Sequence, residues 1–334
     1  MEKIKAVALL SGGLDSTLAA NLIKEQGIEI VVLNIKTSFC LCDRHSSTGC
    51  SNEAFKVARD LGLEIKIINA TAEILEIIKN PKHGFGSHMN PCIDCRILTF
   101  RKAKELMQEI GAKFVITGEV LGQRPMSQRK DAIIAIEKES GLLGLVLRPL
   151  SAKLLPETIP EKNGWVSRAK LLDFSGRSRS PQIALAKLFE IKDYPCSAGG
   201  CLLTDAGFSR RINDLLWHSE LEMKNIELLK IGRHFRISKK TKLIVARNEK
   251  EGERLIGLAR AGDAIFEPKE LPGPTAILRG NFEEKVKLIS AQIVAKYTNP
   301  TQEVKIAIKT MPQLKEEVIS VKASNEEELK EYLI

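Results

Sequence analysis

Short apolar runs alternate with amphipathic stretches along the first 120 residues of the chain. The apolar runs are rich in β-branched residues, which is typical of strands buried in a sheet, and they cover Ile4–Leu10, Ile28–Ile35, Glu64–Asn69 and Lys113–Thr117. Between them, apolar residues recur at helical spacing in Asp15–Glu25, Asn52–Leu61, Ala72–Lys79 and Arg96–Ile110. This alternation predicts an α/β fold, in which helices cover both faces of a parallel, twisted sheet.

The pattern changes twice further along the chain. Residues 118–210 are rich in loops, and from about residue 222 short strand-like runs alternate with helix-like ones, as in Lys242–Ala246 and Glu251–Ala261. A chain of 334 residues is long enough for more than one domain. We therefore predict a catalytic domain over residues 1–215 and a smaller α+β domain over residues 222–334.

The turn Ser11–Ser16, with the sequence Ser-Gly-Gly-Leu-Asp-Ser, joins the first predicted strand to the first predicted helix. Backbone N–H groups at the start of a helix favour an anion, and Gly12 and Gly13 let the backbone approach a phosphate closely. No Gly-Lys-Ser/Thr follows, so the turn differs from the Walker loop. Because ligands of parallel sheets bind at the carboxyl ends of the strands, Thr37 and Thr117, which follow or end two strands, should line the same rim.

Seven cysteines, an odd number, do not suit a framework of paired disulfides. Cys92 and Cys95 are spaced so that both thiolates reach one metal, and they lie where a helix N-terminus should lower a thiol pKa. One distant cysteine, Cys196 or Cys201, would add a third thiolate, which would leave one iron of a [4Fe–4S] cluster open to a small sulfur species. The other of these two would then be a fourth thiol beside it. Four thiolates would instead saturate a structural Zn²⁺; both possibilities stay open, and we favour the cluster.

Cys40, Cys42 and Cys50 form a third group on the loop after the second strand, close in sequence to His45. A zinc site, a persulfide relay and ordinary loop cysteines all fit this group, and we assign it no role.

The formal net charge of +9 and pI of about 9.1 suit a polyanionic partner such as nucleic acid, although a solvated lysine-rich surface gives the same numbers. No apolar run approaches the roughly 20 residues that span a bilayer. The N-terminus has no signal-peptide pattern. We expect a cytoplasmic protein without a membrane partner.

The turn Ser11–Ser16 resembles the PP-loop of the N-type ATP pyrophosphatases, which cut ATP between the α and β phosphates. Residues 1–210 as a whole resemble the PP-loop tRNA thiolation enzymes, and the matching segments are Asn90 to Cys95, Thr117 to Gln128, Arg148 to Lys153 and Ala198 to Thr204. This resemblance implies an adenine nucleotide alpha hydrolase-like fold. Residues 224–300, beginning around Ile231-Gly232-Arg233-His234, look like the RNA-binding region of the NFACT proteins, which implies a surface for tRNA.

The resemblance implies an ATP-dependent tRNA uridine sulfurtransferase of the 2-thiouridine or 4-thiouridine synthase type. Asp15 would act through Mg²⁺, and Asp15, Cys92 and Cys201 would be catalytic, with sulfide or a persulfide carrier as the sulfur donor. The expected nucleotide contacts are Ser11, Gly12, Gly13, Asp15, Ser16, Thr37, Thr117, Gly118 and Gln123, and the expected cluster ligands are Cys92, Cys95 and Cys201. Arg124, Arg177 and Arg179 are candidate RNA contacts.

The alternative is a PP-loop ligase or thiolase that acts on a substrate other than tRNA, with the cysteines holding structural zinc. An ammonia-using ligase would need no cysteine pair, and a non-enzymatic RNA-binding protein would not need an intact Ser11–Ser16 turn. The sequence leaves a homodimer open.

Overall fold

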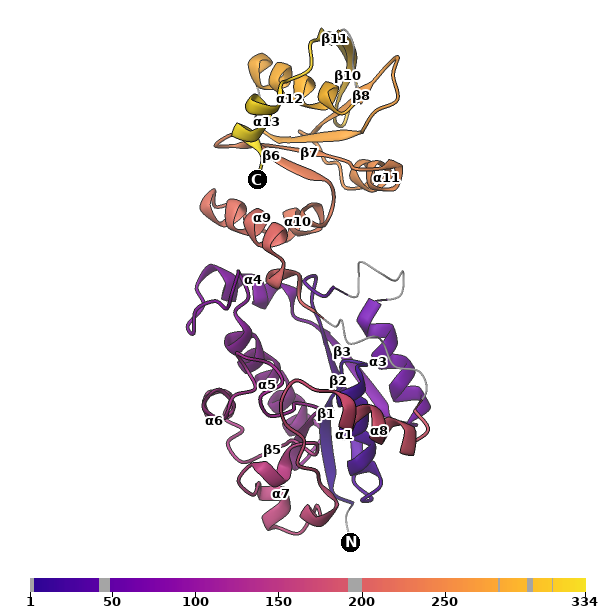
Figure 1. Cartoon of the computed structure of the whole chain (residues 1–334), viewed down its shortest axis with the longest axis vertical. Coiled ribbons are helices and arrows are strands. Elements are labelled where there is room, and N and C mark those ends of the chain that lie inside the picture. Colours follow the sequence, from indigo (N-terminus) through magenta and orange to yellow (C-terminus); the bar gives the residue numbers. More distant parts are fainter. Residues whose placement is uncertain (1–2, 42–48, 192–199, 282, 299–302, 314) are drawn as a thin grey trace. The chain divides into compact units, whose positions relative to one another are not determined.

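The computed structural model describes residues 3–41, 49–191, 200–281, 283–298, 303–313 and 315–334. The chain divides into two compact units, Met1–Thr204 and Asp205–Ile334, and each is described by itself (Figure 1). Among the described residues, no helix is both long enough and apolar enough to cross a membrane.

The first unit is built on a parallel sheet of five strands in the order β3-β2-β1-β4-β5. The strands are β1 Lys5–Leu9, β2 Glu29–Lys36, β3 Glu64–Asn69, β4 Phe114–Thr117 and β5 Val146–Leu147. The central strand β1 pairs with β2 on one side and with β4 on the other, so that Leu9 lies opposite both Leu33 and Thr117. The segment after β1 therefore emerges at the middle of the carboxyl edge.

Helices cover both faces of this sheet, and the alternation of side chains along β1 explains why. Ala6 and Ala8 pack into one buried cluster with α1, α3 and α8, whereas Val7 and Leu9 pack into another with α5 and α6. The helices of the unit are α1 Leu14–Lys24, α3 Gly49–Asp60, α4 Thr71–Lys79, α5 Cys92–Glu109, α6 Lys130–Ser140, α7 Ile159–Lys162 and α8 Ser180–Leu188. Three short 3₁₀ turns are Ala152–Leu154, Arg168–Lys170 and Leu202–Thr204.

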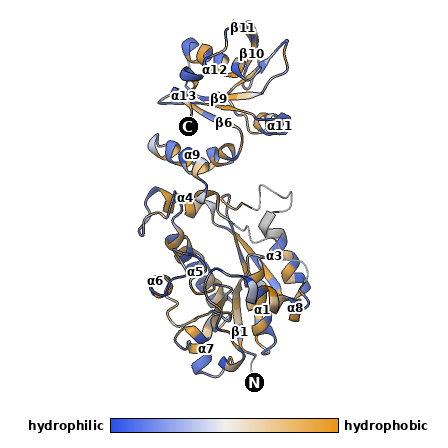
Figure 2. Cartoon of the chain, viewed as in Figure 1, coloured by the Kyte–Doolittle hydropathy of each residue, from blue (hydrophilic) through white to orange (hydrophobic). Residues whose placement is uncertain are grey.

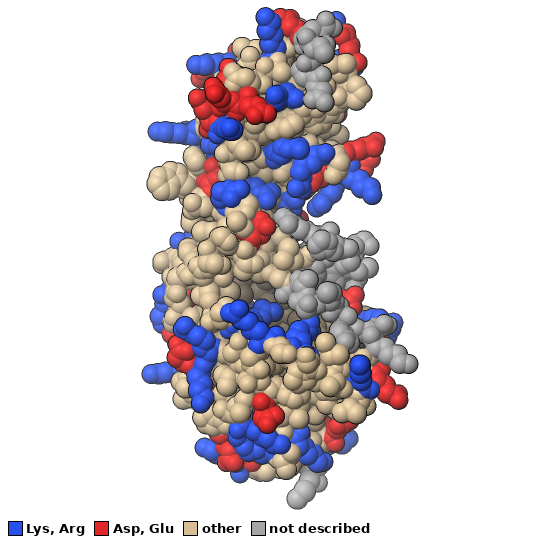
Figure 3. Space-filling model, viewed as in Figure 1, with Lys and Arg blue, Asp and Glu red and all other residues tan. Residues whose placement is uncertain are grey.

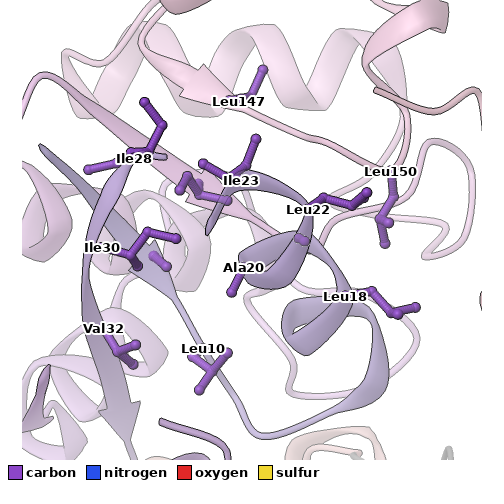
Figure 4. Close-up of a cluster of buried hydrophobic side chains, with 14 of the residues drawn as sticks. Leu10, Leu18, Ala20, Leu22, Ile23, Ile28, Ile30, Val32, Leu147 and Leu150 are labelled. Carbon is purple, nitrogen blue, oxygen red and sulfur yellow. The ribbon is translucent and has the colours of Figure 1, made fainter. Parts of the chain in front are cut away.

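Figure 4 shows the first cluster, in which side chains of α1 pack against those of β2 on one face of the sheet. Helix α3, for example, contains both hydrophobic and hydrophilic residues, as expected of an amphipathic helix (Figure 2). The predicted fold, a parallel sheet with helices on both faces, is confirmed.

The second unit contains an antiparallel sheet of six strands in the order β11-β10-β8-β9-β7-β6. Its strands are β6 Arg233–Ser238, β7 Thr241–Val245, β8 Ala264–Pro268, β9 Ala276–Gly280, β10 Val304–Thr310 and β11 Lys315–Val321. Its helices are α9 Ala206–Trp217, α10 Met223–Ile226, the 3₁₀ turn η4 Glu227–Lys230, α11 Glu249–Gly257, α12 Glu284–Lys296 and α13 Glu326–Tyr332. One face of the sheet packs on α12 and α13, and the other packs on η4 and α11. The predicted α+β character of this region is confirmed.

The second unit begins at Asp205, ahead of residue 222, where the sequence pattern changes. Asp214 of α9 accepts hydrogen bonds from Arg236 of β6 and Lys242 of β7, at distances of 2.6 and 3.0 Å. These ion pairs tie α9 to the second sheet, and such long-range pairing is not visible in local sequence patterns.

Candidate active site

The Ser11–Ser16 turn lies at the carboxyl end of β1 and opens α1, as the sequence predicts. Its side chains brace its own backbone: the Ser16 hydroxyl donates to the Gly13 carbonyl at 2.8 Å and accepts from the Ser11 amide at 3.3 Å. Thr17 also donates to the Gly13 carbonyl, at 3.1 Å. These contacts hold the start of α1 in place, where the first N–H groups of the helix have no partner within the helix itself.

Two positions of this site need glycine, because a side chain there would collide with neighbouring backbone atoms. Gly12 has a φ of +78°, and a Cβ on it would lie 2.7 Å from the Ala54 nitrogen of α3. A Cβ on Gly118, just after β4, would lie 2.4 Å from the Ser16 nitrogen. The backbone after β4 is thus pressed against the Ser11–Ser16 turn, which brings the predicted residue Gly118 to the turn.

The two carboxylate oxygens of Asp15 differ in their hydrogen bonding. Gln123 donates its amide to Oδ2 at 3.0 Å, while Oδ1 is buried and has no hydrogen-bond partner. A buried, unpaired carboxylate oxygen beside an anion-binding turn is costly unless a cation occupies the site, and oxygen ligands of this kind are those that Mg²⁺ prefers. The donor chemistry therefore fits Mg²⁺, and the contact with Gln123 brings together two residues predicted for the nucleotide site.

Thr117 ends β4 and is buried, and its hydroxyl accepts a hydrogen bond from Arg96 at 2.7 Å. Arg96 also donates to Glu119 at 2.6 Å, and Arg148 donates to the other Glu119 oxygen at 3.0 Å. Burial alone would raise the pKa of Glu119, but the two arginines outweigh it and hold that pKa below its usual value. Sequence analysis quoted Glu119 and Arg148 within matching segments but assigned them no role.

Thr37 follows β2 at the same edge and is partly exposed. Its hydroxyl accepts a hydrogen bond from the Phe39 amide at 3.4 Å, which begins a turn toward Cys40. Parallel pairing of β1, β2 and β4 therefore brings the Ser11–Ser16 turn, Thr37 and Thr117 to one edge of the sheet.

Cys92 and Cys95 lie in the first turn of α5, which begins at Cys92 rather than at the predicted Arg96. The Asn90 amide donates to Cys92 Sγ at 3.3 Å, and Arg96, the residue after Cys95, reaches the end of β4. The cysteine pair is thereby tied to the same rim as the Ser11–Ser16 turn.

Cys201 lies beside Cys40, a pairing that sequence analysis missed. The two residues form a short antiparallel bridge, and it is extended by hydrogen bonds from the Leu41 amide to Gly200 (3.0 Å) and from the Leu202 amide to Phe39 (2.7 Å). No local signal could have found a contact between residues so far apart in sequence. Cys42, His45 and Cys196 lie outside the described residues.

The helix N-terminus does not lower the thiol pKa at Cys95, contrary to expectation. Burial raises the pKa of Cys95 to about 11, and the neighbouring Cys92 adds to the rise. Burial also raises the pKa of Cys201 to about 12, and Cys95, Cys92 and Cys40 raise it further. The thiols are thus within electrostatic range of one another, yet in the described part of the chain no three His, Cys, Asp or Glu side chains are close enough to hold a metal ion. Although these thiols raise one another's pKa, cysteine sulfurs are the ligands that a soft cation or an iron–sulfur cluster prefers.

The segment before α8 contacts the loop after β4 at Leu121. The Gly176 amide donates to the Leu121 carbonyl at 2.8 Å, and α8 begins four residues later. Arg179 Nε and both amide atoms of the fully buried Gln182 have no hydrogen-bond partner. Gln182 gave no signal in the sequence, whereas Arg177 and Arg124 are exposed, as expected for RNA contacts.

A glycine-serine turn at the central strand of a parallel sheet, opening a helix with a carboxylate in its first turn, defines a PP-loop domain. Comparison with known families agrees: residues 2–155 match the family model described as "Thiamine biosynthesis protein (ThiI)", and residues 232–333 match the "NFACT protein RNA binding domain". The first unit is thus similar to the ThiI family over residues 2–155, and the second unit is similar to the NFACT RNA-binding family over residues 232–333.

Curated relatives named "tRNA-specific 2-thiouridylase MnmA" match parts of the chain. The protein of Petrotoga mobilis is 35% identical over 136 residues, 36% of each chain, and that of Leptospira interrogans is 32% identical over 121 residues, 32% of each chain. The protein of Paraburkholderia xenovorans is 26% identical over 82% of this chain and 70% of its own. The chain spans about a third of the length of the first two relatives.

Among solved structures, a 4-thiouridine synthetase bound to RNA and ATP aligns with a TM-score of 0.38 at 22% identity, over 68% of this chain and 52% of its own. The U34-tRNA thiolase NcsA of Methanococcus maripaludis aligns with a TM-score of 0.34 at 17% identity, over 69% of this chain and 74% of its own.

Proposed function

We propose that the chain is an ATP-dependent tRNA uridine sulfurtransferase that works in the cytoplasm. One observation carries the proposal: the end of β4 and the loop after it contact both the predicted nucleotide site and the residue next to the predicted cysteine pair. Gly118 presses on the Ser11–Ser16 turn, while the preceding Thr117 is held by Arg96, next to Cys95. An ATP pyrophosphatase alone would not need thiols beside its nucleotide site.

In this proposal, N–H groups and hydroxyls of the Ser11–Ser16 turn hold the phosphates. The free oxygen of Asp15 would hold Mg²⁺, which when bound would offset the negative charge of the phosphates. A uridine carbonyl oxygen attacks the α-phosphorus, and pyrophosphate leaves. The carbonyl carbon, now joined to AMP through oxygen, is attacked by sulfur, and AMP leaves with that oxygen. Donors fixed in place before the reaction stabilise the charge that develops in each step.

Cys92, Cys95 and Cys201 would hold a [4Fe–4S] cluster, which when bound presents sulfur to the activated base. The protein's own contribution is to hold these thiols partly shielded from water. Sulfide would supply the sulfur at the oxidation level of the product. A persulfide carrier would first form an S–S-linked adduct, and a second thiol would then have to break that bond and end as a disulfide with the carrier.

Asp15→Asn tests the first half of the proposal. We expect tRNA-stimulated release of pyrophosphate to fall about 10²-fold or more, because a carboxylate ligand to the metal is lost. Asp131→Asn is the matched control, since Asp131 also lies in the first turn of a helix but pairs only with the exposed Arg129. Unchanged release in Asp15→Asn would refute the nucleotide site, and mass spectrometry of the tRNA nucleosides would identify the product.

The position of Cys40 favours a second candidate role for the cysteines, in which they hold a structural Zn²⁺. Its backbone bridge to Cys201 brings a fourth cysteine to the group, and four thiolates complete the tetrahedral shell of Zn²⁺. Metal analysis of protein purified without oxygen separates the two candidates. Iron that persists in Cys40→Ser and is lost in Cys92→Ser supports the cluster; zinc that is lost in both variants supports the structural site.

A further inference from the structure

Cys40 and Cys201 lie directly opposite each other in the short antiparallel bridge of the first unit. Two backbone hydrogen bonds flank the pair, and they run from Leu41 to Gly200 (3.0 Å) and from Leu202 to Phe39 (2.7 Å). Because these bonds lie on either side of the two cysteines, the cysteines occupy a non-hydrogen-bonded position of the ladder. This is the position at which opposite side chains come closest together.

The side chains of Cys40 and Cys201 point to the same face of this bridge. Residues directly opposite on antiparallel strands share a face, and their neighbours point to the other face. The neighbours Phe39 and Leu202 are 1% and 0% exposed, so their face is packed into the protein. Cys40 and Cys201 are both partly exposed, so a small reagent in solution can reach them.

The backbone spacing of such a pair suits a disulfide. Cα atoms of a non-hydrogen-bonded antiparallel pair are about 4.5 Å apart, and disulfides join residues whose Cα atoms are ~4.4–6.8 Å apart. Hydrogen bonds on both sides hold the two backbones in this position. A bond between the two sulfurs therefore needs rotation of the side chains and no rearrangement of the strands.

We propose that Cys40 and Cys201 form a reversible disulfide, which takes Cys201 out of the proposed set of metal ligands. The disulfide follows from the geometry of the bridge, and its consequence for the metal rests on the proposed function. A metal ligand must be a thiolate, so a sulfur bonded to another sulfur no longer qualifies. The cytoplasm keeps most thiols reduced, and disulfides that form there are typically transient and respond to oxidants. Oxidation would thus block the metal site, and reduction would restore it.

The oxidant of this reaction is a low-molecular-weight disulfide. The Cys40 thiolate attacks one sulfur of that disulfide, a mixed disulfide forms, and the first small thiolate leaves. The Cys201 thiolate then attacks Cys40 Sγ, and the second small thiolate leaves. The two cysteines together lose two electrons, and the small disulfide is reduced to two thiols, which take up the two cysteine protons. Burial raises the pKa of Cys201 to about 12, so the second step is the slow one.

Peptide mass spectrometry identifies the bond in the full chain. The chain is freed of metal with a chelator, incubated with oxidised glutathione, alkylated to block the remaining thiols and digested with trypsin. Trypsin releases Cys40 in the peptide Thr37–Arg44 and Cys201 in the peptide Asp193–Arg210. We expect these two peptides to be linked, with a mass two hydrogen atoms below their sum, and to separate on reduction.

Each of these peptides contains a second cysteine, Cys42 in the first and Cys196 in the second, which supplies a matched control. Cys40→Ser and Cys201→Ser should each abolish the linked peptide, whereas Cys42→Ser and Cys196→Ser should leave its yield unchanged. The opposite pattern, a link from Cys201 to Cys92 in its place, or no link at all would overturn the inference. Thermal unfolding shows whether each variant folds; if one does not, fragmentation of the linked wild-type peptide still locates the bonded sulfurs.

Uptake of iron tests the consequence for the metal. Iron and sulfide are added without oxygen to the oxidised chain, before and after reduction. We expect the oxidised wild type to lose its iron uptake and the reduced chain to regain it. Cys40→Ser should take up iron equally well with or without prior exposure to oxidised glutathione, because Cys201 then has no partner.

The two measurements separate this inference from the proposed function. Equal iron uptake by the oxidised and reduced wild type, with the linked peptide present, contradicts the proposed role of Cys201 as a metal ligand and leaves the disulfide standing. Iron uptake that is normal in a chain that never forms the linked peptide contradicts the disulfide and leaves the proposed function standing.

Discussion

Glu119→Gln should lower the free energy of unfolding of the first unit by more than the loss of one exposed ion pair does. Glu119 is 3% exposed, and each carboxylate oxygen accepts from a different arginine, Arg96 at 2.6 Å and Arg148 at 3.0 Å. Removing one member of a buried ion pair usually costs about 3–5 kcal/mol, because its partner charges stay buried. We expect the lower end, about 3 kcal/mol, because Glu137 still pairs with Arg148.

The stability difference between wild type and Glu119→Gln should change with pH in a defined direction. The pKa of Glu119 is lowered in the folded state, so its contribution is fully present above the unfolded value of about 4.3 and is lost as pH falls through the folded value. The difference between wild type and Glu119→Gln should therefore be full at neutral pH and shrink below about pH 4.

Urea unfolding followed by tryptophan fluorescence measures the effect. Trp217→Phe leaves Trp165 as the sole tryptophan, and Trp165 packs against the core of the first unit. Glu109→Gln is the matched control: its exposed pair with Lys66 predicts a loss of about 1 kcal/mol or less. A loss in Glu119→Gln no larger than that of the control, or one that stays constant down to acid pH, would refute the reasoning.

Three further outcomes follow from the same geometry. Gly12→Ala forces a Cβ to within 2.7 Å of the Ala54 nitrogen at a φ of +78°, so we expect a lower Tm and loss of pyrophosphate release. Gln123→Leu frees the second oxygen of Asp15, and titration of the reaction with Mg²⁺ should show about tenfold weaker metal affinity. Asp214→Asn removes the ion-pair partner of the buried Lys242 and one of the two partners of the half-buried Arg236, which keeps Glu220. Unfolding monitored by Trp217 should show a loss of about 3 kcal/mol at neutral pH. The loss should shrink below about pH 4, because the pKa of Asp214 is lowered despite burial.

The parallel sheet and the Ser11–Ser16 turn could be predicted from the sequence because their signals are local. Apolar runs and helical periodicity report burial within one element, and a glycine-serine turn reports its own backbone. The link between Gly118 and Ser16 and the hydrogen bond from Gln123 to Asp15 join residues about a hundred positions apart. Motif resemblance brought Gly118 and Gln123 to attention, but only the folded chain shows what they contact.

The cysteines show where local reasoning fails. Spacing predicted that Cys92 and Cys95 act together, and both lie in the first turn of α5. The same reasoning expected a lowered thiol pKa, but burial at Cys95 outweighs the helix N-terminus. The partner of Cys201 is Cys40, which lies in a group that the sequence left without a role. Burial and long-range bridges depend on the whole fold, so residue spacing cannot supply them.

Charge, which first suggested a nucleic-acid partner, does not single out the second unit. Residues 205–334 contain 23 Lys and Arg against 20 Asp and Glu, and Figure 3 shows both signs interspersed over the surface. Several of these cations, Arg236, Lys242 and Arg279 among them, are committed to ion pairs within the unit. A largely neutralised surface attracts RNA only weakly through its phosphates. If this unit binds RNA, its affinity must then come from contacts to bases, and the exposed ring of Trp217 is suited to stack on one.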